Sequence, residues 1–227
     1  MRIVAVLLLG ACQSTQPTTP APAPAHPRHQ HHHPLGHTFE GDASAWAKRF
    51  EGPERDAYQQ PSKVIEAMKL TAGMKVADVG TGTGYFVPHL SRAVGEEGRV
   101  LALDVEPGMI DYVKKRAARD KLDNVDARVV KVDDPGLESG SVDRILIVNT
   151  WHHIPEREQY GKKLLAALAA KGEVWVVDFT MESQHGPPKA HRIPPDKAIA
   201  ELRAAGFKTR LDTALLTDQY IAIGRRP

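Results

Sequence analysis

The sequence predicts one α/β domain, built on a mostly parallel sheet, over roughly residues 61–227. Short apolar, often β-branched segments alternate with longer helical ones, and a glycine-rich stretch directly follows the first strand. Strands that alternate with helices run parallel, because each helix returns the chain to the starting edge of the sheet. A short turn between the last two strands indicates an antiparallel hairpin that closes the sheet.

The strands are identified as short apolar runs bounded by turn residues. We expect them at residues 75–79, 99–104, 127–132, 142–148, 172–179, 208–215 and 220–224. Helices are expected at residues 62–70, 85–93, 108–119, 156–169 and 195–205. The sequence therefore predicts seven strands with helices on both faces of the sheet.

The N-terminus is distinct from this domain. Residues 1–11 combine a basic start with a short apolar run, which is typical of an export signal. The segment Leu9-Gly10-Ala11-Cys12 resembles a bacterial lipobox, which implies lipidation of Cys12. We then expect a protein of the cell envelope that faces the periplasm, and Gln13 after the cysteine favours the outer membrane. The alternative is a chance apolar start in a cytoplasmic protein.

Residues 12–37 consist mainly of Pro, Thr, Ala and His without apolar periodicity, which predicts a disordered tether. This stretch holds six of the 11 histidines, namely His26, His29, His31, His32, His33 and His37. Such a density can bind metal ions, or it can be a solvated linker. Residues 38–60 should form a helical cap anchored by Trp46, Phe50 and Tyr58.

Composition limits the classes of partner and site. There are 30 basic and 28 acidic residues, mixed along the chain, which disfavours nucleic acid and favours a small-molecule or protein substrate. No apolar run approaches the roughly 18 residues that span a bilayer, so membrane contact is expected only through a lipid anchor on Cys12. With one cysteine, we expect no metal site in the folded domain. The oligomeric state is left open.

Three glycines at alternate positions, Gly80, Gly82 and Gly84, follow the first strand. A chain needs such glycines where it turns sharply while its backbone touches a ligand, because a Cβ would block either feature. The dinucleotide fingerprint would need glycine at position 85 or 87, where the chain has Tyr85 and Val87. A ligand other than a pyrophosphate is therefore expected over this loop.

Asp104 ends the second strand. A carboxylate at that position can accept hydrogen bonds from both ribose hydroxyls of a nucleoside. Together with the glycine loop it predicts a nucleoside site.

With these motifs the chain resembles the class I S-adenosylmethionine-dependent methyltransferases, from about residue 61 to residue 224, including their Rossmann-like fold. Residues 76–84 match the family's first motif, Asp104 its ribose-binding acid, and Asp133 the acid near the adenine, with Val105 on the ring. Residues 149–153 fall where the family places groups nearest the reacting methyl. The resemblance implies S-adenosylmethionine as cofactor, bound by Asp78, Gly80, Thr81, Gly82, Gly84, Asp104, Val105, Asp133 and Asn149.

Within the family, residues 148–154 and 194–207 look like the branch of quinone-biosynthesis C-methyltransferases and other small-molecule enzymes. The pair His152-His153 departs from the Asn-Pro-Pro-Tyr motif of enzymes that methylate amino groups of adenine or glutamine. We therefore expect a small-molecule acceptor and no nucleic acid partner.

Methyl transfer by in-line displacement depends mainly on positioning in a dry pocket, and a base near neutral pKa helps when the acceptor loses a proton. His152 or His153 is the candidate base, or one of them only packs beside the cofactor. His191 or Arg192, in the long loop after the fifth strand, is predicted to contact the substrate. Two other functions stay open: an anchored binding protein without turnover, and a metal-handling protein that uses the histidine tract.

Overall fold

The computed structural model describes residues 43–227, so the expected signal, Cys12 and the histidine-rich stretch lie outside the described residues. Seven strands are present: β1 Lys75–Val79, β2 Arg99–Asp104, β3 Val125–Val129, β4 Val142–Val148, β5 Leu168–Phe179, β6 Lys208–Asp212 and β7 Gln219–Arg225. The helices are α1 Ala43–Phe50, α2 Pro53–Gln59, α3 Pro61–Ala67, α4 Val87–Val94, α5 Pro107–Arg119, α6 Arg157–Ala167 and α7 Pro195–Ala204, with short 3-10 turns η1 Trp151–His153 and η2 Lys189–His191.

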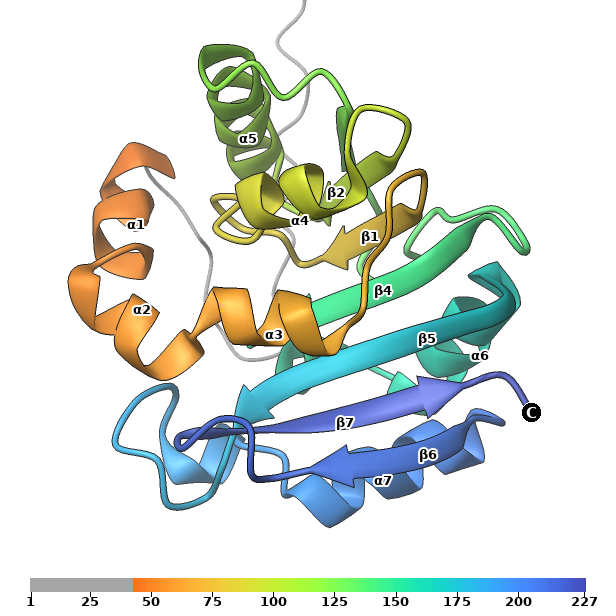
Figure 1. Ribbon diagram of the computed structural model, residues 1–227. Helices are drawn as coiled ribbons and strands as arrows, with labels where there is room; N and C mark the ends of the chain where they lie inside the picture. Colours follow the sequence, from red (N-terminus) through yellow and green to blue (C-terminus); the bar gives the residue numbers. More distant parts are fainter. Residues whose placement is uncertain (1–42) are drawn as a thin grey trace, which may run out of the picture. The chain divides into compact units, whose positions relative to one another are not determined.

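The strands form one sheet in the order β3-β2-β1-β4-β5-β7-β6 (Figure 1). Every neighbouring pair is parallel except those that involve β7, which runs antiparallel to β5 and β6. The predicted seven-stranded, mostly parallel sheet with an antiparallel closing strand is confirmed. No helix among residues 43–227 is both long enough and apolar enough to cross a membrane.

Alternate residues of the central strands pack against helices on the two faces of the sheet. On one face, Ile145, Ile147 and their neighbours pack with apolar residues of α6 and α7. On the other face, Leu146 and Val148 pack with α3 and α4, while α5 covers β2 and β3. The expected helices on both faces are confirmed.

The predicted helical segments before the sheet are present as α1 and α2. In Figure 1 the arrowheads of β1 and β5 point toward these helices, so α1 and α2 lie at the carboxyl edge of the parallel strands. Gln59, the last residue of α2, is fully buried. The tightly packed part of the chain therefore begins before residue 61.

Three strands differ from prediction by more than one residue at an end, because of strand pairing or of a local turn. β3 is Val125–Val129 rather than residues 127–132, since its partner strand ends where Asp104 pairs with Val129. β5 begins four residues early, at Leu168, which is fully buried and pairs with Val142. β6 ends at Asp212, whose carboxylate accepts hydrogen bonds from the next turn instead of continuing the strand.

Candidate functional site

The glycine loop leaves β1 at the carboxyl edge of the sheet. Gly80, Gly82 and Gly84 all have positive φ, at 72°, 54° and 77°, a region that residues with a Cβ rarely adopt. The backbone N–H groups of Gly80 and Thr81 donate to the carbonyl of Leu103, at 2.8 and 3.0 Å, which fixes the loop against β2.

Gly80 and Gly82 differ in what lies beside them. A Cβ built on Gly80 would come within 2.3 Å of Thr150, whereas a Cβ built on Gly82 would meet no atom within 4 Å. Gly80 is thus needed for packing against the protein, and Gly82 faces open space. Thr83 adds a hydroxyl that is buried without a hydrogen-bond partner. A polar molecule lying over Gly82 would fill this space.

Asp78 is buried at the end of β1, and its carboxylate accepts a hydrogen bond from the Thr81 hydroxyl at 2.7 Å. Burial raises the pKa of Asp78 to about 6, against the opposing effects of that hydrogen bond and of the Arg55 charge. This carboxylate is therefore held in a site that favours a cationic or hydrogen-bonding partner.

Asp104 is 8% exposed at the end of β2. Its two carboxylate oxygens accept hydrogen bonds from the N–H of Gly82, at 2.8 Å, and of Glu106, at 3.0 Å. Burial also raises the pKa of Asp104. The structure thus brings Asp104 and the glycine loop together, as the sequence predicts, and each oxygen keeps lone-pair capacity for a ligand hydroxyl.

The residues expected around an adenine ring lie further along the same edge. Val105 is half-buried directly after Asp104, and Asp133 is exposed in the turn after β3. The neighbouring Asp134 carboxylate is occupied, since it accepts from the N–H of Gly136 and from Lys163. The contact of Asp133 with an adenine stays a prediction.

Asn149 begins the loop after β4 with a φ of 53°. Its amide belongs to a closed ring of three side-chain amides: Asn149 donates to Gln59 at 3.1 Å, Gln59 to Gln219 at 2.7 Å, and Gln219 back to Asn149. The ring joins the loop to α2 and β7. The cofactor contact expected of Asn149 stays a prediction; its side chain already has one donor and one acceptor bond.

His152 and Asp178 form a buried pair between η1 and β5. The Nδ1 atom of His152 lies 2.9 and 3.1 Å from the two carboxylate oxygens of Asp178, and the side chains are 3% and 2% exposed. The Asp178 carboxylate also accepts from the N–H of Phe179 at 2.9 Å, so its position is fixed. Asp178 therefore orients the imidazole and leaves Nε2 as the nitrogen that can exchange a proton.

His153 lies beside this pair, with its ring centroid 4.1 Å from that of His152. The contact with Asp178 gives His152 an orienting carboxylate. Catalysis by either histidine stays a prediction.

The loop after β5 is built around Arg192. Its guanidinium donates to the carbonyls of Thr180, Met181, Ser183, His185 and Pro187. All three guanidinium nitrogens are occupied in this way, so Arg192 shapes the loop itself. His191 is half-buried in η2. Substrate contact by either residue stays a prediction.

The helices before the sheet are fixed to the glycine loop at two points. The Tyr85 hydroxyl donates to Asp56, and the Arg55 guanidinium lies 4.0 Å from the centre of the Tyr85 ring. Arg116 of α5 donates both to Glu51, at 2.6 Å, and to the Thr83 carbonyl, at 3.2 Å.

Several of these residues are absent from the sequence-based site, above all Arg55, Gln59, Asp178 and Gln219. Asp178 had a signal in the sequence, because it is an acid inside the apolar strand β5. The other three meet the site only through the tertiary fold.

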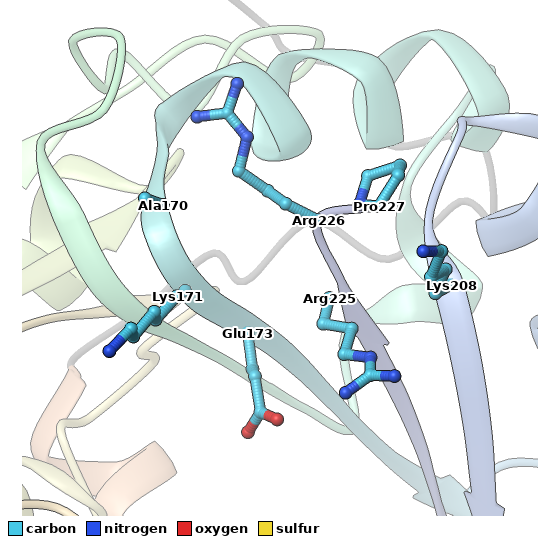
Figure 2. Close-up of a pocket in the computed structure, with 8 residues that line it drawn as sticks. Ala170, Lys171, Glu173, Lys208, Arg225, Arg226 and Pro227 are labelled. Carbon is cyan, nitrogen blue, oxygen red and sulfur yellow. The ribbon is translucent and has the colours of Figure 1, made fainter.

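A concavity of about 320 Å³ lies at the opposite edge of the sheet (Figure 2). Figure 2 shows Lys171 and Glu173 from the start of β5 beside Lys208, Arg225 and Arg226. It contains none of the predicted site residues. Within residues 43–227 there is also no cluster of three or more His, Cys, Asp or Glu side chains arranged to hold a metal ion.

Comparison with known proteins agrees with the geometry at the carboxyl edge. A family model described as a methyltransferase domain matches residues 76–181, which run from β1 to just past β5. A structure of an S-adenosylmethionine-dependent methyltransferase from Aquifex aeolicus is 27% identical, with a TM-score of 0.75, and the alignment covers 82% of this chain and 98% of that one.

Two curated relatives align with a smaller part of the chain. The ubiquinone/menaquinone biosynthesis C-methyltransferase UbiE of Idiomarina loihiensis is 28% identical over 122 residues, 51% of this chain and 47% of that protein. A protein-L-isoaspartate O-methyltransferase of Methanococcus maripaludis is 30% identical over 93 residues, 41% of this chain and 44% of that protein. The chain therefore spans less than half the length of these relatives.

Proposed function

The folded part of the chain is a class I S-adenosylmethionine-dependent methyltransferase domain, and from this premise we propose that the protein methylates a small-molecule acceptor that loses a proton in the reaction. S-adenosylmethionine supplies an activated methyl group on a sulfonium. The observation that carries the proposal is the contact between the Asp104 carboxylate and the N–H of Gly82, beside the open space over the loop. This contact places the acid proposed to bind the ribose next to the glycine backbone proposed to contact the rest of the cofactor.

The choice of acceptor rests on the pair His152–Asp178. A buried carboxylate that fixes Nδ1 of a histidine is the arrangement of a general base, because it sets the tautomer and stabilises the imidazolium formed when Nε2 takes a proton. Such a base helps when the acceptor is a hydroxyl, a phenol or an acidic carbon. UbiE, a C-methyltransferase by name, supports a carbon acceptor, and the isoaspartate enzyme supports an oxygen.

The cofactor part is tested by titrating the full chain with S-adenosylmethionine and S-adenosylhomocysteine in a calorimeter. We expect binding in the wild type and a loss of about tenfold to 100-fold in Asp104→Ala, because hydrogen bonds to a charged group are lost. Asp111→Ala is the matched control, since Asp111 is an exposed acid on α5. A folded wild-type protein that binds neither ligand would contradict the proposal.

The acceptor part is tested by transfer of a labelled methyl group to a panel of phenols, quinols and acidic carbon compounds, beside isoaspartyl peptides. Methylation of a small acceptor supports the proposal. Methylation of the peptides alone would replace it with a protein substrate. Tight cofactor binding without transfer to any compound would favour the binding protein without turnover.

We also propose that the domain is anchored in the cell envelope through a lipid on Cys12. The support is the lipobox-like segment before Cys12. Metabolic labelling with an alkyne fatty acid should mark the wild type and not Cys12→Ala. Label-free protein in the cytoplasm would contradict the anchor.

Deleting residues 26–37 tests the histidine tract: unchanged cofactor binding and methylation identify a linker.

A further inference from the structure

Gln59 ends α2 where the chain turns into α3. Its side chain is fully buried, and the next residue, Gln60, has a φ of 43°. A left-handed conformation costs free energy in a residue with a Cβ, so contacts elsewhere in the fold must hold it. The side-chain hydrogen bonds of Gln59 are contacts of this kind.

A second left-handed residue lies on the other side of these hydrogen bonds. Asn149 leaves β4 with a φ of 53°, donates to Gln59 at 3.1 Å and accepts from Gln219. Gln59 donates to Gln219 at 2.7 Å, and Gln219 is also fully buried. A buried amide that loses its partner is costly, so this amide ring holds the end of α2 and the start of the loop after β4 in place together.

The loop that starts at Asn149 carries the imidazole of His152. The N–H of Asn149 donates to the carbonyl of Val177 at 2.9 Å. His152 lies three positions after Asn149, and its Nδ1 atom is 2.9 Å from the carboxylate of Asp178, the neighbour of Val177. Because so few residues separate Asn149 from His152, a change in the direction in which the chain leaves β4 displaces the imidazole.

We propose that Gln59 and Gln219 are positioning residues for methyl transfer: through Asn149 they hold the loop after β4 in the shape in which His152 takes a proton from the acceptor. The inference rests on the proposed function, because that function makes His152 the base. Gln59 precedes the family-matched residues 76–181 and Gln219 follows them, so the positioning comes from segments outside the matched part.

The test replaces each glutamine of the full chain by leucine, a side chain of similar size without an amide. Gln59→Leu and Gln219→Leu should each lower kcat about tenfold to 100-fold with a phenol or quinol that the wild type methylates, because a small displacement of a reacting group costs about that much. The affinity for S-adenosylhomocysteine should change less than about twofold, since the ring acts on the loop of the base.

The double variant should be within about twofold of the slower single variant, because residues of one hydrogen-bond network do not contribute independently. Gln59→Glu still accepts from Asn149 but, when ionised, cannot donate to Gln219, so its kcat should fall between those of the wild type and Gln59→Leu. Gln159→Leu, which replaces an exposed glutamine of α6, is the matched control and should leave kcat unchanged.

A second measurement needs no acceptor. An imidazole N–H that donates to a carboxylate gives a far-downfield proton NMR signal, and His152→Gln identifies the signal of His152 by its absence. Gln59→Leu and Gln219→Leu should shift or broaden this signal, whereas Gln159→Leu should not. A wild type without the signal would overturn the oriented base and, with it, the role of the amide ring.

Unchanged kcat in folded Gln59→Leu and Gln219→Leu would overturn the inference. A lower kcat with an unmoved His152 signal would also overturn it, and so would a loss of cofactor affinity as large as the loss in kcat, since the ring would then only hold α2 in place. A wild type that methylates no compound of the panel would reject the proposed function, while the His152 signal would still decide whether the ring holds the loop.

Discussion

The two edges of the sheet differ in how they hold their charged groups. At the carboxyl edge Asp78, Asp104, His152 and Asp178 are each less than 9% exposed and hydrogen-bonded to the Thr81 hydroxyl, to backbone or to each other. At the opposite edge Lys171, Lys208 and Arg225 are exposed around the concavity of Figure 2.

A concavity alone therefore does not identify the site in this fold. The concavity of about 320 Å³ has exposed charges that water already solvates, so it gives a ligand little to replace. The carboxyl edge holds charges out of water at an energetic cost, which a ligand of complementary charge offsets. The following variants test this difference, from the largest expected effect to the smallest.

Replacing His152 should have the largest effect. His152→Gln is expected to lower kcat about 100-fold to 10,000-fold with an acceptor from the panel, because the proton acceptor is lost, and to leave binding of S-adenosylhomocysteine unchanged. Asp178→Asn keeps the acceptor for the N–H of Phe179 and should lower kcat with little change in KM. Steady-state kinetics check both. The control is His89→Gln, which replaces a half-buried histidine of α4. Equal kcat values in the wild type and all three variants would show that His152 takes no part in the reaction.

Filling the space over the loop should come next. Gly82→Ala and Gly73→Ala both put a Cβ at positive φ, 54° and 84°, where nothing lies within 4 Å, so each should lose about 1–2 kcal/mol of unfolding free energy. Only Gly82→Ala should also weaken S-adenosylhomocysteine, by more than about tenfold, because its methyl occupies ligand space. Chemical denaturation and calorimetry separate the two effects. Equal affinities of the two variants for S-adenosylhomocysteine would show that the ligand does not lie over Gly82.

Acid should weaken cofactor binding through Asp78. Burial raises its pKa to about 6, so the unliganded carboxyl is neutral below that pH, while a ligand ammonium requires the charged form. Affinity for S-adenosylhomocysteine should fall as the pH drops through 6, by at most about tenfold per unit. Burial also raises the pKa of Asp104, so that group titrates in the same direction.

Asp78→Asn distinguishes the two acids, since it should flatten the dependence near pH 6. A slope that persists in this variant would assign the titration to Asp104. The same pKa shift affects stability. Because the pKa of Asp78 is higher in the folded than in the unfolded protein, the free energy of unfolding of the unliganded protein should fall by up to about 3 kcal/mol as the pH rises from about 4 to about 6.

The smallest effect is expected at the opposite edge. The double variant Lys208→Ser, Arg225→Ser removes two exposed charges from the concavity of Figure 2. It should change the affinity for S-adenosylhomocysteine less than about twofold and the unfolding free energy less than about 0.5 kcal/mol. A large loss of affinity would show that the two edges are coupled and would weaken the contrast between them.

Sequence patterns predicted the sheet and the glycine loop because both are local. Strands such as β4 are continuous apolar runs, and Gly80, Gly82 and Gly84 follow one strand directly. Asp104 was predictable because a strand end fixes its place in the fold. The ends of the strands were harder to predict. β3 ends at Val129 because its partner strand ends at Asp104, and this pairing cannot be read from composition.

Arg55, Gln59 and Asp178 reach the site through contacts between distant segments. The pair His152–Asp178 spans 26 positions, and the bond between Gln59 and Gln219 spans 160. Asp178 had a signal as an acid inside an apolar strand, but composition gives no measure of such distances, and Arg55 and Gln59 look like ordinary surface residues. Their burial, visible only in the fold, is what marks them.

The ring of Gln59, Asn149 and Gln219 has a property that none of its bonds has alone. Each amide gives one hydrogen bond and accepts one around the circle, so the three can point only one way round or, if all three turn over together, the other way. Turning one amide alone breaks two bonds. The three amides that join α2, the loop after β4 and β7 therefore reverse their orientation together or not at all.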